Sequence, residues 1–311
     1  MRRWNGFWFE PVSTSTLALL RICFGLVAFA WTISLAPDLS AFFSSAGILG
    51  AQPTAPGAWG ILGLAPGGGV VLGLYAATLV GSLALAAGWR TRLAAVVVFV
   101  GLLSFERRNP FVFNSGDGLL RVIAFYVMLA PAGAAVSVDR WRAERDRFWE
   151  CPGRAPWAIR LLQIQLSVIY LAGVWDKVQG TTWNNGTAVS YALRVSDLAA
   201  LPVPAFLSQS PVIVNLLTFG TLATELALGI LVWNRRLRRW VLTAGVGFHL
   251  AIGWAIRVGF FSVGMLVLYV AFVDPDWAAA KLLAVRDRRS RRAARRARPP
   301  VVVGVEAGAV D

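Results

Sequence analysis

Five polar side chains follow one face of a long apolar segment near the middle of the chain. Arg160, Gln163, Ser167, Tyr170 and Lys177 are three, four, three and seven residues apart, a spacing that puts all five on one face of a helix. Polar groups at membrane depth cost several kcal/mol unless they are paired, so this face must turn inward. Two interpretations stay open: hydrogen bonds that hold helices together, or the wall of a ligand cavity.

Lys177 ends this polar face and directly follows Asp176. A lysine that is desolvated there could lose its proton and act as a general base. The alternative is a long side chain that reaches toward the membrane surface and pairs with Asp176.

A carboxylate occurs in a later apolar segment, where Glu225 shares a helix face with Thr218 and Thr221. Glu225 could be protonated there, or it could pair with Arg21 or Arg121, which also lie within apolar segments. If Glu225 forms an ion pair, its role is structural. If it carries a proton, its role is functional.

His249 and Asp117 are two further candidates for chemistry. His249 is the only histidine of the chain and lies between Gly245 and Gly253, so it could bind a quinone-like oxygen, move a proton, or make a packing hydrogen bond. One histidine without neighbouring cysteines or carboxylates does not make a metal site, so we expect none. Asp117 stands where a helix is expected to begin, and it could cap that helix or tune Lys177.

The composition explains why these residues stand out. Of the 311 residues, 57% are hydrophobic and 15% are charged, whereas a soluble domain is about one quarter charged. The net charge of +14 sits in short loops and in the tail, which is typical of membrane proteins and argues against nucleic-acid binding. The sequence therefore predicts an all-α integral membrane protein.

A helix that crosses the bilayer needs about 20 mostly apolar residues. Apolar segments that fit this length predict a bundle of about eight transmembrane helices with outer loops. They lie at about 15–36, 68–88, 93–106, 118–136, 157–177, 211–233, 238–256 and 258–274.

The distribution of basic residues predicts the orientation of this bundle. With eight crossings and the N-terminus inside, 22 of the 30 Lys and Arg residues fall in inner loops or the tail. We therefore expect a protein of the cell membrane with both termini in the cytoplasm. Residues 1–11 form the expected cytoplasmic N-terminus, 12–275 the membrane domain, and 276–311 a basic, disordered tail. The first apolar segment is expected to be a retained helix rather than a signal peptide.

Three runs of residues resemble a known family. The first joins ERRNP from Glu106 with NSGD ending at Asp117; the second joins YLAGVWDK ending at Lys177 with GTTW ending at Trp183; the third combines Glu225 with His249. Over about residues 12–275 they resemble the HTTM (horizontally transferred transmembrane) domain family, which is related to the membrane half of vitamin K-dependent gamma-carboxylase. The family also includes SdpB-like proteins, which help to mature or export a secreted peptide.

The resemblance implies that Lys177 is a base. In the carboxylase the matching lysine is thought to deprotonate vitamin K hydroquinone, so a vitamin K or menaquinone-type quinol is the cofactor that the resemblance implies. Asp117 lies in the neighbourhood of a histidine that assists the carboxylase lysine. The large lumenal part that binds the carboxylase's protein substrate has no counterpart here, which weakens the expectation of protein carboxylation.

These observations combine into one hypothesis and one alternative. The hypothesis is a cavity between helices that binds a quinone-like or lipid ligand, with Lys177, Asp117 and His249 as candidate catalytic residues. Its expected lining comprises Arg160, Gln163, Ser167, Tyr170, Trp183 and Glu225. The alternative is a non-enzymatic helper for a secreted peptide or protein, in which the polar interior is structural. Whether the protein is an enzyme stays open.

Overall fold

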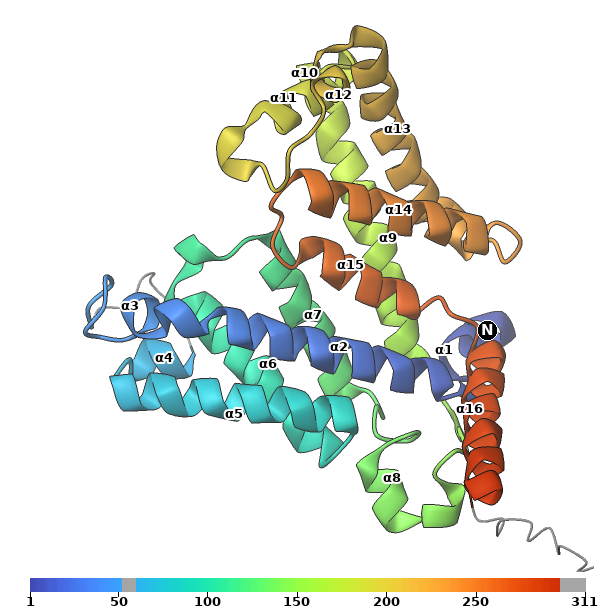
Figure 1. The fold of residues 1–311 in the computed structure, drawn as a ribbon. Coiled ribbons are helices and arrows are strands. Elements are labelled where there is room, and N and C mark those ends of the chain that lie inside the picture. The colour runs from blue at the N-terminus through green and yellow to red at the C-terminus, as the bar shows by residue number, and fades with distance from the viewer. Residues whose placement is uncertain (52–59, 297–311) are drawn as a thin grey trace, which may run out of the picture.

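The structure, a computed structural model, describes residues 1–51 and 60–296 and is mainly α-helical (Figure 1). Each of the eight apolar segments predicted from the sequence overlaps one helix of ten or more residues. These helices are α2 (Ser15–Ser34), α5 (Gly68–Ala87), α6 (Thr91–Arg108), α7 (Ser115–Leu129), α9 (Trp157–Val178), α13 (Pro211–Ile230), α14 (Arg238–Ala255) and α15 (Phe261–Val270).

Four of the described helical stretches are long and apolar enough to cross a membrane. They are Ser15–Phe43, Gly68–Ala87, Trp157–Val178 and Pro211–Trp233. A fifth is added if α15 and the helix after it, which bend by 91°, count as one span. The ten residues of α15 rise about 15 Å, roughly half the apolar thickness of a bilayer. The helical membrane class is thus supported, whereas the count of about eight spans stays a prediction.

Short elements lie at the two ends of the long helices. In Figure 1, α3 (Leu39–Phe43) and α4 (Ile61–Leu64) lie at one end of α2 and α5, and α1 (Arg2–Phe9) and α8 (Val138–Ala143) lie at the other. The remaining short helices and turns are η1 (Ala36–Asp38), η2 (Pro110–Val112), η3 (Arg145–Arg147), α10 (Thr181–Asn184), α11 (Ala188–Arg194), η4 (Ser196–Leu198), α12 (Ala205–Gln209) and η5 (Leu231–Trp233).

A two-stranded antiparallel ladder ties the N-terminal segment to the loop that precedes α9. Strand β1 (Val12–Ser13) pairs with β2 (Gly153–Arg154), with Val12 opposite Arg154 and Ser13 opposite Gly153. Because β2 directly precedes α9, this ladder fixes the start of α9 beside the start of α2.

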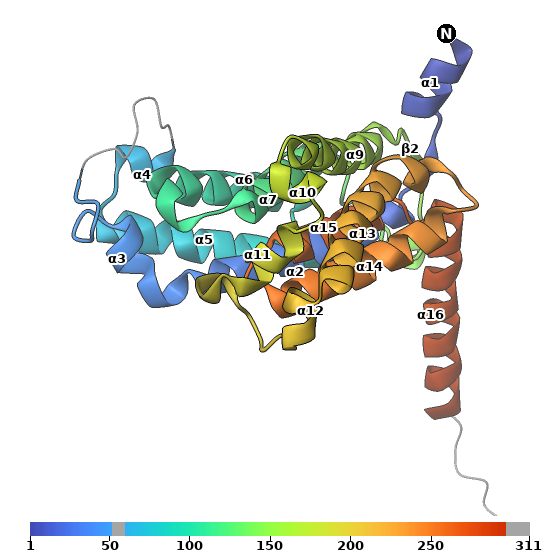
Figure 2. The same ribbon diagram turned by 90° about the horizontal axis from the view of Figure 1, so that it is seen from above.

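The C-terminal segment differs from the expected disordered tail. Residues Pro275–Arg296 form helix α16, which runs across the end of the long helices (Figure 2). Its start is capped because Asp274 Oδ1 accepts hydrogen bonds from the N–H groups of Asp276 and Trp277 at 3.0 and 3.1 Å. Proline at the first helical position and the following alanines and arginines favour a helix. The expectation of disorder is therefore wrong for 276–296, and residues 297–311 lie outside the described part.

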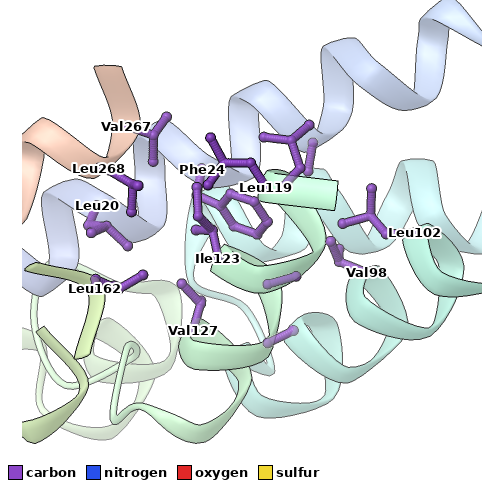
Figure 3. Packing of buried hydrophobic residues seen from close by; sticks show 14 of the residues in the cluster. Leu20, Phe24, Val98, Leu102, Leu119, Ile123, Val127, Leu162, Val267 and Leu268 are labelled. Atoms are coloured by element: carbon purple, nitrogen blue, oxygen red, sulfur yellow. The ribbon is translucent and has the colours of Figure 1, made fainter. Parts of the chain in front are cut away.

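The buried core joins α2, α6, α7, α9 and α15 (Figure 3). Leu20 and Phe24 of α2, Ile123 of α7 and Leu268 of α15 are completely buried. Gly25 lets α2 approach α5 closely, because a Cβ atom there would lie 2.6 Å from the backbone nitrogen of Ala86. Small residues at such crossings are typical of helices packed in membranes.

Candidate functional site

An ion pair joins the end of α9 to the middle of α13. Lys177 Nζ lies 2.9 Å from both carboxylate oxygens of Glu225 and 3.5 Å from the carbonyl oxygen of Gly173. The Lys177 side chain is 24% exposed and the Glu225 side chain 10%. Gly173, one turn before Lys177, keeps the space open because a Cβ atom there would lie 3.4 Å from Nζ.

The partners weighed from the sequence were the wrong ones. Asp176 does not share a helix face with Lys177, because consecutive residues on a helix point about 100° apart. Arg21 instead donates hydrogen bonds to backbone carbonyls, and Arg121 Nη1 pairs with Glu106 at 2.5 Å. Glu225 therefore pairs with neither arginine.

The Lys177–Glu225 pair faces a cavity of about 410 Å³. Its walls come from α9, α10, α11, α12, α13, α14 and the start of α15, and they are mostly apolar. The lining residues are Lys177, Trp183, Val189, Ala192, Leu193, Val203, Leu207, Leu217, Thr221, Glu225, Phe248, Ala251, Ile252, Trp254, Ala255, Ile256, Val258 and Phe261. In the described lining, Lys177 and Glu225 are the only charged side chains, and most of the others are apolar.

Hydrogen bonds hold the segment between α9 and α13 in place as one wall of this cavity. The Ser190 hydroxyl donates to the carbonyl of Ser208 at 2.7 Å and joins α11 to α12. The Ala200 N–H donates to the carbonyl of Ala255 at 3.1 Å and joins the same segment to the end of α14. Trp183 belongs to the lining, and its ring centroid lies 5.4 Å from Lys177 Nζ.

His249 and Tyr170 lie behind the cavity rather than in its lining. The Tyr170 hydroxyl is 2.7 Å from His249 Nε2 and 2.5 Å from the Tyr269 hydroxyl, and His249 Nδ1 is 3.4 Å from Ser262 Oγ. His249 is only 1% exposed. Neither His249 nor Tyr170 belongs to the described lining, whereas Phe248, next to His249 in α14, does.

The other half of the polar face of α9 holds helices together. Ser167 Oγ accepts a hydrogen bond from Trp233 Nε1 at 2.8 Å, and Gln163 Nε2 donates to the carbonyl of Ala271 at 2.7 Å. Arg160 Nη1 donates to Gln163 Oε1 at 2.9 Å. None of these three side chains belongs to the described cavity lining, and the bonds of Ser167 and Gln163 join α9 to other parts of the chain.

Asp117 is also held by structural contacts. Its Oδ2 accepts a hydrogen bond from the Asn114 N–H and its Oδ1 accepts one from Trp31 Nε1, both at 2.7 Å. It forms a capping box at the start of α7 and lines a separate hollow of about 240 Å³. Asp117 therefore acts as a helix cap, and the structure does not bring it to Lys177.

Sequence reasoning missed most of the cavity walls. Leu193 and Leu207 come from short helices between α9 and α13, where no periodic pattern is long enough to reveal a buried face. Gly173 could have been found, because it lies one helical turn before Lys177. Among the described residues, no three His, Cys, Asp or Glu side chains gather as a metal ion would require.

These features define a helical membrane protein with an apolar cavity around a partly buried lysine–glutamate pair. The model of the HTTM domain matches residues 9–277, so the chain belongs to the HTTM domain family. This match confirms the resemblance drawn from the three runs of residues. No curated protein and no solved structure matches the chain.

Proposed function

We propose that this protein binds one lipid-soluble molecule in the cavity, with an oxygen-bearing head group at the Lys177–Glu225 pair. The volume of about 410 Å³ falls within the range of about 300–1,000 Å³ that is usual for ligand pockets. Apolar walls suit an isoprenoid or acyl chain, and the pair supplies both a hydrogen-bond donor and an acceptor. A quinone-type molecule has this chemistry. The charged pair within an apolar cavity is the observation that carries the proposal.

The choice of lysine at position 177 supports acid–base chemistry at this pair. Of the 30 Lys and Arg residues in the chain, only Lys177 and Lys281 are lysines. Arginine keeps its proton in proteins, whereas lysine can release it. In the proposed step the Lys177 ammonium passes a proton to Glu225. The resulting amine takes the proton of a ligand hydroxyl, which leaves a ligand oxyanion beside the Lys177 ammonium and a neutral Glu225.

We also propose that the protein lies in the cell membrane with both termini in the cytoplasm and with eight crossings. Helices α1 and α16 lie at the same end of the molecule in Figure 2, an arrangement that supports an even number of crossings. The basic loops around Arg90, Arg140 and Arg235 belong to this end on the proposed path, in keeping with the excess of positive charge in cytoplasmic loops.

The test compares wild type with Lys177→Ala and with Lys281→Ala, the matched control that removes the exposed lysine outside the cavity. Each protein is placed in nanodiscs with reduced menaquinone, and binding is followed by tryptophan fluorescence because Trp183 and Trp254 line the cavity. We expect Lys177→Ala to bind at least about tenfold more weakly, equivalent to about 1.4 kcal/mol. Lys281→Ala should bind like wild type.

Turnover is measured in the same samples by mass spectrometry of quinone and epoxide under oxygen. Turnover that disappears only in Lys177→Ala supports acid–base chemistry at Lys177. Binding without turnover supports a ligand-binding protein that is not an enzyme. If wild type neither binds nor turns over the quinol, this ligand class is wrong and the helper for a secreted peptide or protein becomes the better hypothesis.

A further inference from the structure

A second hollow, here called the basic hollow, lies at the opposite end of the long helices. It has a volume of about 610 Å³, and its lining includes Arg90, Arg92 and Arg154. All three arginines are exposed. Within the described part of the chain, their guanidinium groups make no hydrogen bond or ion pair, so three positive charges share this hollow without a protein partner.

The basic hollow lies directly after the end of an apolar helix. Helix α5 is one of the four stretches long enough to cross a membrane, and it ends at Ala87. Gly88 then turns the chain with a φ of 72°, and Trp89, 40% exposed, precedes Arg90. Tryptophan and arginine together are typical of the boundary between lipid and water. The hollow therefore lies at the depth of phospholipid head groups.

The floor of the basic hollow is rigid because the buried Arg21 holds it. The Arg21 guanidinium donates hydrogen bonds to the carbonyls of Ala132 and Val136 at 3.2 and 2.7 Å. It also donates to the carbonyl of Ala86 at 3.4 Å, which ties the loop after α7 to the end of α5. Ala132 and its neighbours line the hollow, so its shape exists without a ligand.

The acidic residue in the lining is already engaged. Asp139 accepts hydrogen bonds from the Arg90 N–H at 2.7 Å, the Thr91 N–H at 2.8 Å and the Thr91 hydroxyl at 2.7 Å. These bonds fix the backbone of Arg90 and leave its side chain available. The β1–β2 ladder fixes the backbone of Arg154 in the same way.

We propose that the basic hollow binds the phosphate group of an anionic phospholipid from the inner leaflet. Arginine recognises phosphate through several N–H groups at once, and three arginines outweigh the single carboxylate. Leu93 of α6 and Val127 of α7 add apolar walls on which the first part of an acyl chain can lie. Such basic pockets between helices on the cytoplasmic side are suited to phospholipid head groups. This site is independent of the cavity at Lys177.

The test measures phosphatidylglycerol and phosphatidylcholine binding to the full chain by native mass spectrometry. The variant is Arg90→Gln/Arg92→Gln/Arg154→Gln, which leaves the backbone bonds to Asp139 intact. The matched control is Arg235→Gln/Arg236→Gln/Arg239→Gln, which removes three exposed arginines from another basic loop. Each arginine near an anionic lipid contributes about fivefold to affinity, so the variant should lose about a hundredfold in phosphatidylglycerol affinity. The control should lose clearly less phosphatidylglycerol affinity than the variant, because its three arginines do not line the basic hollow.

Several outcomes would overturn the proposal. Wild type could bind the two lipids equally, or both triple variants could weaken phosphatidylglycerol binding to the same extent. Displacement of the lipid by millimolar glycerol 3-phosphate would identify a soluble phosphate compound as the ligand instead. If the triple variant does not fold, Arg92→Gln alone gives the same test with an expected loss of about fivefold. Quinol binding at Lys177 should be unchanged in the variant, which separates this result from the proposed function.

Discussion

The strength of the Lys177–Glu225 pair can be measured with a double-mutant cycle of Lys177→Met and Glu225→Gln. Two unit charges about 4 Å apart attract by about 4 kcal/mol at an effective dielectric constant of about 20. The atoms here are 2.9 Å apart, but the lysine side chain is 24% exposed, so solvent weakens the attraction. Breaking a fully buried pair costs about 3–5 kcal/mol. We therefore expect each single variant to lose about 3 kcal/mol of unfolding free energy.

The double variant should lose about 3 kcal/mol rather than 6, because it removes both charges together and leaves neither unpaired. The coupling free energy is then about 3 kcal/mol, measured by equilibrium unfolding in mixed micelles with far-UV circular dichroism. The control cycle uses the exposed pair Arg147–Glu144, whose side chains are 62% and 47% exposed, and should give less than about 1 kcal/mol. A coupling below about 0.5 kcal/mol for Lys177–Glu225 would refute a desolvated pair at the cavity.

Three further predictions concern other parts of the molecule. Arg21→Met should lower the unfolding free energy by about 3 kcal/mol or more, because backbone carbonyls around the guanidinium lose their donor; an unfolding midpoint like that of wild type would contradict this role. Ala251→Trp should fill the cavity and weaken quinol binding at least about tenfold in the fluorescence assay while the helical content stays the same; unchanged binding would locate the ligand elsewhere. Burial acts to raise the pKa of Asp139, but hydrogen bonds from Thr91 and Arg90 and the charge of Arg21 outweigh it and hold this pKa below its usual value. The ionised Asp139 thus stabilises the folded state above about pH 4, and this contribution is lost as the pH falls through the lowered pKa; the unfolding free energy measured between about pH 2 and 5 should depend less on pH in Asp139→Asn than in wild type.

The sequence predicted the long helices well because lipid imposes a simple length and polarity rule. The segment expected at about 157–177 is the helix Trp157–Val178, and the one at about 68–88 is Gly68–Ala87. Gln163 and Tyr170 are buried, which confirms that the polar face of α9 turns inward. The short α15 departs from the rule, because apolar residues within 258–274 continue beyond the helix in irregular backbone.

The partners of the polar residues could not be predicted in the same way. Glu225 lies 48 positions after Lys177, and only the packing of α13 against α9 brings them together. Gln163 and Lys177 belong to one helix face. Gln163 nevertheless donates to the backbone carbonyl of Ala271, whereas Lys177 faces the cavity. Spacing along a helix gives the direction of a side chain, whereas its partner depends on which helix lies opposite.

The buried Arg21 has a consequence for how the chain enters the membrane. Helix α2 is made early, but two of the carbonyls that bind its guanidinium belong to Ala132 and Val136, 111 and 115 residues later. Until those residues leave the ribosome, the Arg21 guanidinium lacks two of its acceptors, and water or head groups at its depth must take their place. The hydrogen bonds of the Arg21 guanidinium are therefore complete only after the loop that follows α7 has been synthesised.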